Sequence, residues 1–181
     1  MGFSNPVDET ARRSPVVVVR PADVPDVEAI MGLERRPGFA AFVGRSDAAD
    51  HRAMLADPRF AYRLGLSADG EAVAFAILSG LGDPNGNLYL KRIAAVRPGE
   101  GVGTAFLARV LDEAFGDLGA WRFHLDCFES NRRAQAAYRK LGFSRDGVLR
   151  QAWLRPDGTR ADLVLMALLK PEWQARTRPA G

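Results

Sequence analysis

Three glycines stand at alternate positions in the segment Gly99-Glu100-Gly101-Val102-Gly103-Thr104. An apolar run from Leu90 to Val96 precedes this segment, and a pattern of helical period follows it. Glycine lets the backbone approach a ligand closely, and a helix N-terminus presents unpaired N–H groups and a positive dipole end. The combination predicts an anion site, most often for phosphate. The alternative is a tight strand-to-helix connection that binds nothing.

This glycine turn matches neither of the two common phosphate-binding motifs. Thr104 occupies the place of the third glycine in the dinucleotide-binding fingerprint, and no Gly-Lys-Ser/Thr of a P-loop follows. The turn alone therefore does not identify its ligand.

Two further side chains lie on one predicted helix. Asn131 stands at its start, and Tyr138 stands two helical turns further along the same face. Taken singly, Asn131 is typical of a helix cap, and Tyr138 is typical of a core aromatic residue whose hydroxyl finds a partner.

Taken together with the glycine turn, these residues resemble the GNAT superfamily of acyl-CoA-dependent N-acyltransferases. The resemblance rests on Ile93 to Leu107 and on Asn131 to Phe143, which follows the family's Asn-x-x-Ala-x-x-x-Tyr-x-x-x-Gly-Phe pattern. The end of the chain is similar to the subgroup of ribosomal-protein N-terminal and polyamine or small-amine acetyltransferases. The segments that carry this second likeness are Gly147-Val148-Leu149-Arg150, Asp157-Gly158, Asp162 and Pro171-Glu172-Trp173.

The resemblance implies acetyl-CoA as the acetyl donor and a role for each matched residue. The strand end Ala94-Ala95-Val96 would pair with the pantetheine arm, and a backbone N–H there would stabilise the oxyanion. Asn131 would bind the pantetheine arm or order the site, and Tyr138 would protonate the departing thiolate, because a phenol stays protonated near pH 7. The amides that would bind the pyrophosphate are those of Gly99, Glu100, Gly101, Val102, Gly103 and Thr104.

The turn departs from the family pattern at Pro98. Relatives usually carry Arg or Gln at this place, three residues before the second-last glycine. Either Arg97 substitutes from the preceding position, or the loop is shorter. The backbone anion site does not depend on this difference.

The sequence offers several candidates for the general base. Many relatives use a carboxylate on the strand before the turn, where this chain has Lys91 and Arg92. We predict Glu34, at the end of the first helix, as the base, because the acceptor loop should follow it; a solvated helix-end carboxylate is the alternative. Asp126 and Glu129 are the other candidates, as is a water chain that leads to no single base.

The remaining reactive side chains are expected to be structural. His51 and His124 lie outside the matched motifs. Cys127 has no neighbouring His and carboxylate of the kind that nucleophilic catalysis needs, which argues against covalent acyl transfer. No His, Cys or Asp spacing predicts a metal site.

The composition is that of one ordinary globular domain, since 47% of the 181 residues are hydrophobic and 26% are charged. The net charge of +3 is spread along the chain, so we expect no nucleic-acid partner. The lone Cys127 fits a reducing compartment. No apolar run approaches the roughly 20 residues of a membrane span, and the first residues lack a signal-peptide pattern, so a cytoplasmic protein without a membrane partner is expected.

The apolar patterns predict a mixed α/β fold in one domain. The resemblance implies that this domain is GNAT-like, with a central, mostly antiparallel sheet of about seven strands and about four helices. We place the domain at 15–170, after a disordered leader at 1–14 and before a frayed tail at 171–181. Ser130 is expected to cap the helix that carries Tyr138. The alternation along the strand at 87–96 slips at Arg92-Ile93, which indicates a β-bulge or a strand buried on both faces.

These observations predict an enzyme that transfers acetyl from acetyl-CoA directly to a primary amine of a small molecule or a peptide N-terminus. A non-catalytic acyl-CoA-binding module on the same fold and a nucleotide-binding protein are the alternatives. Acceptor loops are expected at 32–46 and 150–162, where Phe39, Phe42 and Trp153 either line a pocket or belong to the core. A homodimer is allowed, since some relatives pair through edge strands or the final hairpin.

Overall fold

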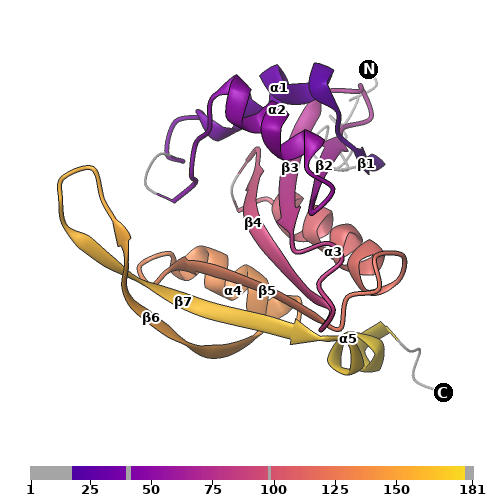
Figure 1. Ribbon diagram of the computed structural model, residues 1–181, viewed down its shortest axis with the longest axis vertical. Helices are drawn as coiled ribbons and strands as arrows, with labels where there is room; N and C mark the ends of the chain where they lie inside the picture. The colour runs from indigo at the N-terminus through magenta and orange to yellow at the C-terminus, as the bar shows by residue number, and fades with distance from the viewer. Residues whose placement is uncertain (1–17, 40–41, 98, 178–181) are drawn as a thin grey trace, which may run out of the picture.

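The computed structural model describes residues 18–39, 42–97 and 99–177 (Figure 1). The predicted leader, Pro98 and residues 178–181 lie outside this described part. The strands are β1 (Val18–Pro21), β2 (Phe60–Leu66), β3 (Ala72–Ser79), β4 (Asn87–Ala95), β5 (Arg122–Phe128), β6 (Ser144–Leu154) and β7 (Arg160–Leu169). The helices are η2 (Val24–Asp26), α1 (Val27–Glu34), α2 (Ala48–Ala56), α3 (Val102–Phe115), α4 (Arg132–Lys140) and α5 (Lys170–Thr177).

The strands form a seven-stranded sheet in the order β1-β2-β3-β4-β5-β7-β6. Every neighbouring pair is antiparallel except β4 and β5, which run parallel. The predicted mixed α/β class and the seven-stranded, mostly antiparallel sheet are confirmed. None of the helices in the described part of the chain is both long and apolar enough to cross a membrane.

The two faces of the sheet are covered by different helices. Tyr62 and Ile77 are opposite each other in the β2–β3 pair, and Tyr62 contacts His51 of α2, so this face carries α1 and α2. On the other face Phe106 of α3 fills the space beside Gly65, where an added Cβ would lie 2.8 Å from the phenyl ring. The alternation of each strand therefore assigns its side chains to one helical layer or the other.

The strands β4 and β5 separate part-way along their length, as Figure 1 shows. They are paired only from Asn87 to Leu90 on β4 and from Arg122 to Leu125 on β5. At the point of separation β4 contains a β-bulge: Leu90 is opposite Leu78 and Arg92 is opposite Ile77, which leaves Lys91 as the extra residue. The slip in the sequence pattern is thus a bulge, and it bends β4 away from β5.

Several helix ends are stabilised by side-chain caps and by glycine, and one cap differs from the prediction. Asp23 and Asp26 form a capping box at the start of η2, and Gly142, with φ of 98°, follows the C-terminus of α4. The N-cap of α4 is Asn131 and not Ser130, because the Asn131 side chain accepts a hydrogen bond from the Ala134 N–H at 3.1 Å.

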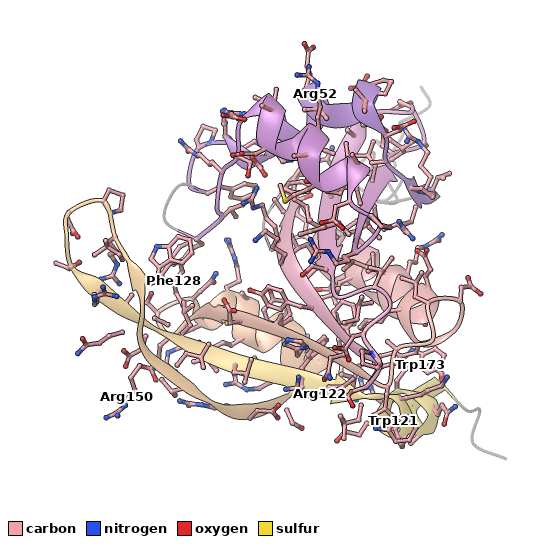
Figure 2. All side chains as sticks on the ribbon, viewed as in Figure 1. Arg52, Trp121, Arg122, Phe128, Arg150 and Trp173 are labelled. Atoms are coloured by element: carbon pink, nitrogen blue, oxygen red, sulfur yellow. The ribbon has the colours of Figure 1, made fainter. Side chains whose placement is uncertain are left out.

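The segment after Pro171 is a helix, α5, and not the expected frayed tail. The Glu172 carboxylate accepts a hydrogen bond from the Leu169 N–H at 2.9 Å, at the start of this helix. Trp173 stacks on Phe115 of α3 with ring centroids 5.4 Å apart, where α5 meets the body of the domain (Figure 2). Proline in a first helical turn is a start signal, and here that property outweighs its role as a breaker.

Candidate active site

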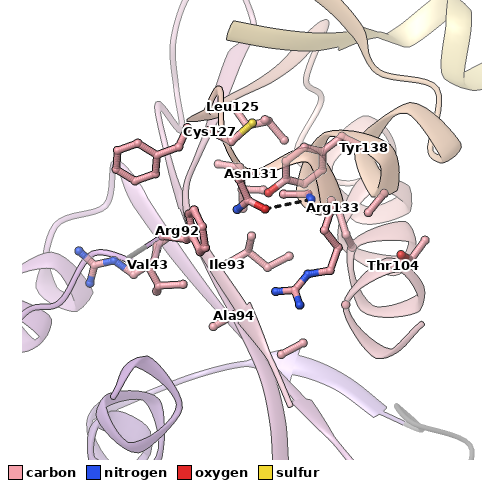
Figure 3. A pocket seen from close by; sticks show the side chains of 18 of the residues that line it. Val43, Arg92, Ile93, Ala94, Thr104, Leu125, Cys127, Asn131, Arg133 and Tyr138 are labelled. Carbon is pink, nitrogen blue, oxygen red and sulfur yellow. Dashed lines mark hydrogen bonds between the residues drawn. The ribbon is translucent and has the colours of Figure 1, made fainter. Parts of the chain in front are cut away.

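A cavity of about 580 Å³ lies where β4 and β5 separate (Figure 3). Its wall has two parts that belong to opposite faces of the sheet. We call the part on the α3 and α4 face the glycine-turn arm; it is formed by Gly99, Gly101, Gly103, Thr104, Asn131, Arg133 and Tyr138. We call the part on the α1 and α2 face the aromatic arm; it is formed by Phe39, Phe42, Val43, Gly44, Tyr89, Arg92, Asp126, Phe128 and Trp153.

The glycine turn presents the N-terminus of α3 to the cavity. Gly101 is the N-cap of α3 with φ of 83°, and no side chain caps this end. Gly99 has φ of 100°, and an added Cβ at either glycine would meet nothing within 4 Å. Both glycines are therefore required by their backbone conformation, while the uncapped first turn supplies N–H groups and positive potential for an anion.

Not every residue of the predicted phosphate site contributes to the cavity wall. Val102 is buried in the core, and the Glu100 N–H donates a hydrogen bond to the Arg97 carbonyl oxygen at 3.2 Å. Arg97 itself lines the cavity, with φ of 50° and its guanidinium 3.7 Å from the Glu100 carboxylate. Arg133, which the sequence did not single out, reaches over the glycine-turn arm from α4 (Figure 3).

Ala94, Ala95 and Val96 line the cavity along β4, as predicted for the strand before the turn. The Val96 N–H is already used, since it donates to the Val73 carbonyl oxygen at 2.8 Å. Beyond Leu90 no residue of β4 pairs with β5 in the described register. This side of β4 is therefore an open strand edge within the cavity wall.

Tyr138 and Asn131 both lie in the cavity wall, and both have a structural function in addition. Burial raises the pKa of the Tyr138 phenol above its usual value near 10, and the neighbouring Cys127 and Asp126 raise it further. The Tyr138 ring also packs on Phe143, with centroids 5.8 Å apart. The carboxamide oxygen of Asn131 is used by the helix cap, which leaves its NH₂ group as the part suited to a ligand.

The sequence did not single out Tyr89, which binds Asp126 across the gap between the strands. Its hydroxyl donates a hydrogen bond of 2.7 Å to Asp126 Oδ2, and both residues line the cavity. Burial, and then this hydrogen bond to a carboxylate, raise the pKa of Tyr89. Asp126 directly follows Leu125, the last β5 residue paired with β4. The only signal for Asp126 in the sequence was its place at the end of that strand.

Glu34 lies at the end of α1 and is completely buried, so it is not a solvated carboxylate. Its Oε1 accepts a hydrogen bond of 2.5 Å from Arg92 Nη1, and its Oε2 lies 3.3 Å from the Ser46 nitrogen and 3.4 Å from His51 Nε2. His51 is also hydrogen-bonded to Tyr62, and burial is the main reason that the pKa of Tyr62 is raised to about 12. Arg92 lines the cavity and Glu34 does not.

The other reactive side chains either lie outside the cavity wall or are held in an unreactive form. Burial lowers the pKa of His124, and burial raises the pKa of the Cys127 thiol to about 11, which keeps it in the unreactive protonated form. Glu129 lies 3.6 Å from Arg145 and is not part of the cavity wall. Within the described ranges no three His, Cys, Asp or Glu side chains are grouped to hold a metal ion.

Three rings from separate parts of the chain meet in the aromatic arm. Phe128, at the end of β5, is in edge-to-face contact with Phe42 at 6.1 Å and with Trp153 of β6 at 5.7 Å (Figure 2). Phe42 is 41% exposed and Trp153 is 44% exposed, while Phe39 is buried. The predicted acceptor loops therefore do meet at the cavity.

A family model described as the acetyltransferase (GNAT) family matches residues 28–143, more than half of the chain. The chain belongs to the GNAT acetyltransferase family. As a member of this family it is an acetyl-CoA-dependent N-acetyltransferase, which confirms the predicted family, enzyme class and donor.

Solved structures with the same fold include spermidine N-acetyltransferases. The enzyme from Vibrio cholerae in complex with CoA and spermine matches with a TM-score of 0.76 and 18% identity, over 87% of this chain and 97% of that chain. A chimera of the Vibrio cholerae enzyme and hSSAT matches with a TM-score of 0.75 and 18% identity, over 88% of this chain and 98% of that chain. At these identities the likeness concerns the fold.

Proposed function

We propose that this GNAT protein transfers the acetyl group directly to a primary amine of a small molecule or a peptide N-terminus, with the amine entering through the aromatic arm. One observation carries the proposal: the cavity passes through the gap between β4 and β5 and has a group that can accept or donate a proton on each side. Asp126, hydrogen-bonded to Tyr89, lies on the α1 and α2 face. Tyr138 lies on the α3 and α4 face.

The alternation of β5 supports this division. Asp126 has the same orientation as His124, which packs on Tyr89 with ring centroids 5.1 Å apart. Phe123 points to the opposite face, where its ring contacts Phe143, the neighbour of Tyr138. A group that accepts a proton and a group that donates one are therefore separated by the strand gap.

The glycine-turn arm fits coenzyme A. Gly99, Gly101, Gly103 and Thr104 would hold its pyrophosphate at the uncapped N-terminus of α3, and Arg97 and Arg133 add positive charge there. The open edge of β4 at Ala94 and Ala95 suits an amide-containing arm, which the Asn131 NH₂ group can also contact. When bound, acetyl-CoA supplies an activated acetyl group as a thioester.

Tyr138 is assigned the role of general acid. Its raised pKa keeps the phenol protonated throughout the physiological range, so a proton is available for the thiolate that leaves.

Asp126 is assigned the role of general base, in place of Glu34. Its Oδ2 is fixed by Tyr89, and the carboxylate lines the cavity. Glu34 lies behind Arg92, so an amine would reach it only if that guanidinium moved aside. Glu34 is better suited to position Arg92.

Thiol release from acetyl-CoA over a panel of primary amines tests the assignment. We expect Asp126→Asn to lower kcat/KM about 10²- to 10⁴-fold, with an unchanged calorimetric Kd for acetyl-CoA. Glu129→Gln is the matched control, because this carboxylate lies outside the cavity. Full activity of Asp126→Asn contradicts the proposed base. So does a loss of kcat/KM that is equal for every amine and occurs in Glu34→Gln but not in Asp126→Asn.

A further inference from the structure

The cavity wall carries an uneven set of charges. Its cations are Lys91, Arg92, Arg97, Arg133 and Lys140, and its one carboxylate among the described residues is Asp126. Arg97 and Arg133 are accounted for by the phosphates of the proposed donor. Arg92 is not, because it lies on the other face of the sheet, opposite Ile77, in the aromatic arm.

Arg92 is held in one orientation by buried groups. Its Nη1 donates to Glu34 Oε1 at 2.5 Å and lies 3.3 Å from Ser46 Oγ. Glu34 is fixed in turn by His51, which lies against Tyr62. The side chain of Arg92 is only 11% exposed. A guanidinium ordered in this way is preorganised for a ligand.

The opposite edge of this guanidinium, formed by Nε and Nη2, has no hydrogen-bond acceptor among the described residues. Gly44 lies beside this edge, where the lack of a side chain leaves room: an added Cβ there would be 3.1 Å from Nη2, 3.3 Å from Nε and 3.5 Å from Cζ. Glu34 balances the charge of Arg92 but contacts only Nη1. The Nε and Nη2 pair is the edge of arginine that binds a carboxylate with two parallel hydrogen bonds.

We propose that the acceptor is a primary amine that also carries a carboxylate, and that Arg92 binds this carboxylate while Asp126 receives the amine. The inference rests on the proposed function and deepens it. A polyamine, which has several positive charges, would meet Arg92 and Lys91 in the wall and a single carboxylate. The aromatic arm adds apolar surface for the remainder of the acceptor.

Pairs of amines that differ only by a carboxylate provide the test. Phenylalanine is compared with 2-phenylethylamine, and lysine is compared with cadaverine, with spermidine as the polyamine. We expect kcat/KM to be about 10- to 100-fold higher for the carboxylated member of each pair, which corresponds to about 1.4–2.8 kcal/mol and lies close to the range for a charged hydrogen bond.

Removing Arg92 should remove this preference. Arg92→Met alone leaves Glu34 buried and unpaired, which is expected to be strongly destabilising, so the double variant Glu34→Gln/Arg92→Met removes both charges. We expect its ratio between the paired amines to fall to near 1. Arg92→Lys keeps the positive charge but lacks the paired Nε and Nη2 donors, so it should give an intermediate ratio. Glu129→Gln should keep the wild-type ratio.

Each alternative result is decisive. A wild-type preference for the decarboxylated amines or for spermidine overturns the inference and leaves the proposed function intact, as does an unchanged ratio in the folded double variant. Binding of acetyl-CoA without thiol release for any amine overturns the proposed function, and this inference with it.

Discussion

The two arms of the cavity are built in different ways. The anion site of the glycine-turn arm depends on backbone conformation over a few consecutive residues, with two positive-φ glycines and one uncapped helix end. The aromatic arm depends on side chains from distant parts of the chain, such as the Arg92 and Glu34 pair, 58 residues apart. This difference fits our proposal, in which a donor common to the family is bound chiefly by backbone groups and the acceptor is bound by side chains.

The largest effect is expected at Tyr138, on the side of the gap that faces the helices α3 and α4. Tyr138→Phe should lower kcat about 10²- to 10⁴-fold with little change in the Kd for acetyl-CoA, because only the proton donor is lost. Since the pKa of Tyr138 is raised, its protonated form persists above pH 10. The wild-type enzyme should therefore lose no activity through deprotonation of this phenol near pH 10, the usual pKa of tyrosine. Assays of thiol release at several pH values measure both kcat and its pH dependence.

A variant with full turnover at every pH would remove Tyr138 from its assigned role. Glu129→Gln is a suitable control, because this side chain lies 3.6 Å from Arg145 and outside the cavity wall.

A smaller effect is expected in the glycine-turn arm. Gly101→Val forces a β-branched residue into φ of 83°, which costs at least about 1–2 kcal/mol and distorts the N-terminus of α3. Acetyl-CoA should bind roughly tenfold more weakly by calorimetry, while the ratio between carboxylated and decarboxylated amines stays the same. Gly119→Val, also at positive φ but away from the cavity, separates the binding effect from general strain.

The smallest effect is expected in the aromatic arm at Gly44. In Gly44→Ala the Arg92 guanidinium must shift by a few tenths of an ångström, since the new Cβ would lie 3.1 Å from Nη2. We expect the preference for carboxylated amines to fall a few-fold, with an unchanged Kd for acetyl-CoA. Gly32→Ala, in α1 with nothing near its Cβ, should stabilise the fold by about 0.5–1 kcal/mol and leave the preference unchanged. An equal fall in both variants would mean that Gly44 has no special relation to Arg92.

The sequence predicted the parts of this protein whose physics is local. The strands, the glycine turn and the irregularity at Arg92-Ile93 all follow from patterns within about ten residues. The missed features depend on tertiary contacts. Trp173 holds α5 against Phe115, and the sequence could not show that this ring would be adjacent.

The same limit applied to the site. Asn131 and Tyr138 were found because their spacing on one helix matched a family pattern. Tyr89 and Asp126 meet only because two strands lie side by side before they separate. Glu34 stood at the expected place in the chain, but its complete burial behind Arg92 could not be read from a helix-end carboxylate.

The central claim is that the donor and the acceptor reach the gap between β4 and β5 from opposite faces of the sheet. A crystal structure of the complex with CoA tests it most directly. We expect the pyrophosphate at Gly99 to Thr104 and the thiol sulfur within hydrogen-bonding distance of the Tyr138 hydroxyl, on the α3 and α4 side. A CoA thiol located in the aromatic arm beside Arg92, or outside the strand gap, would contradict it.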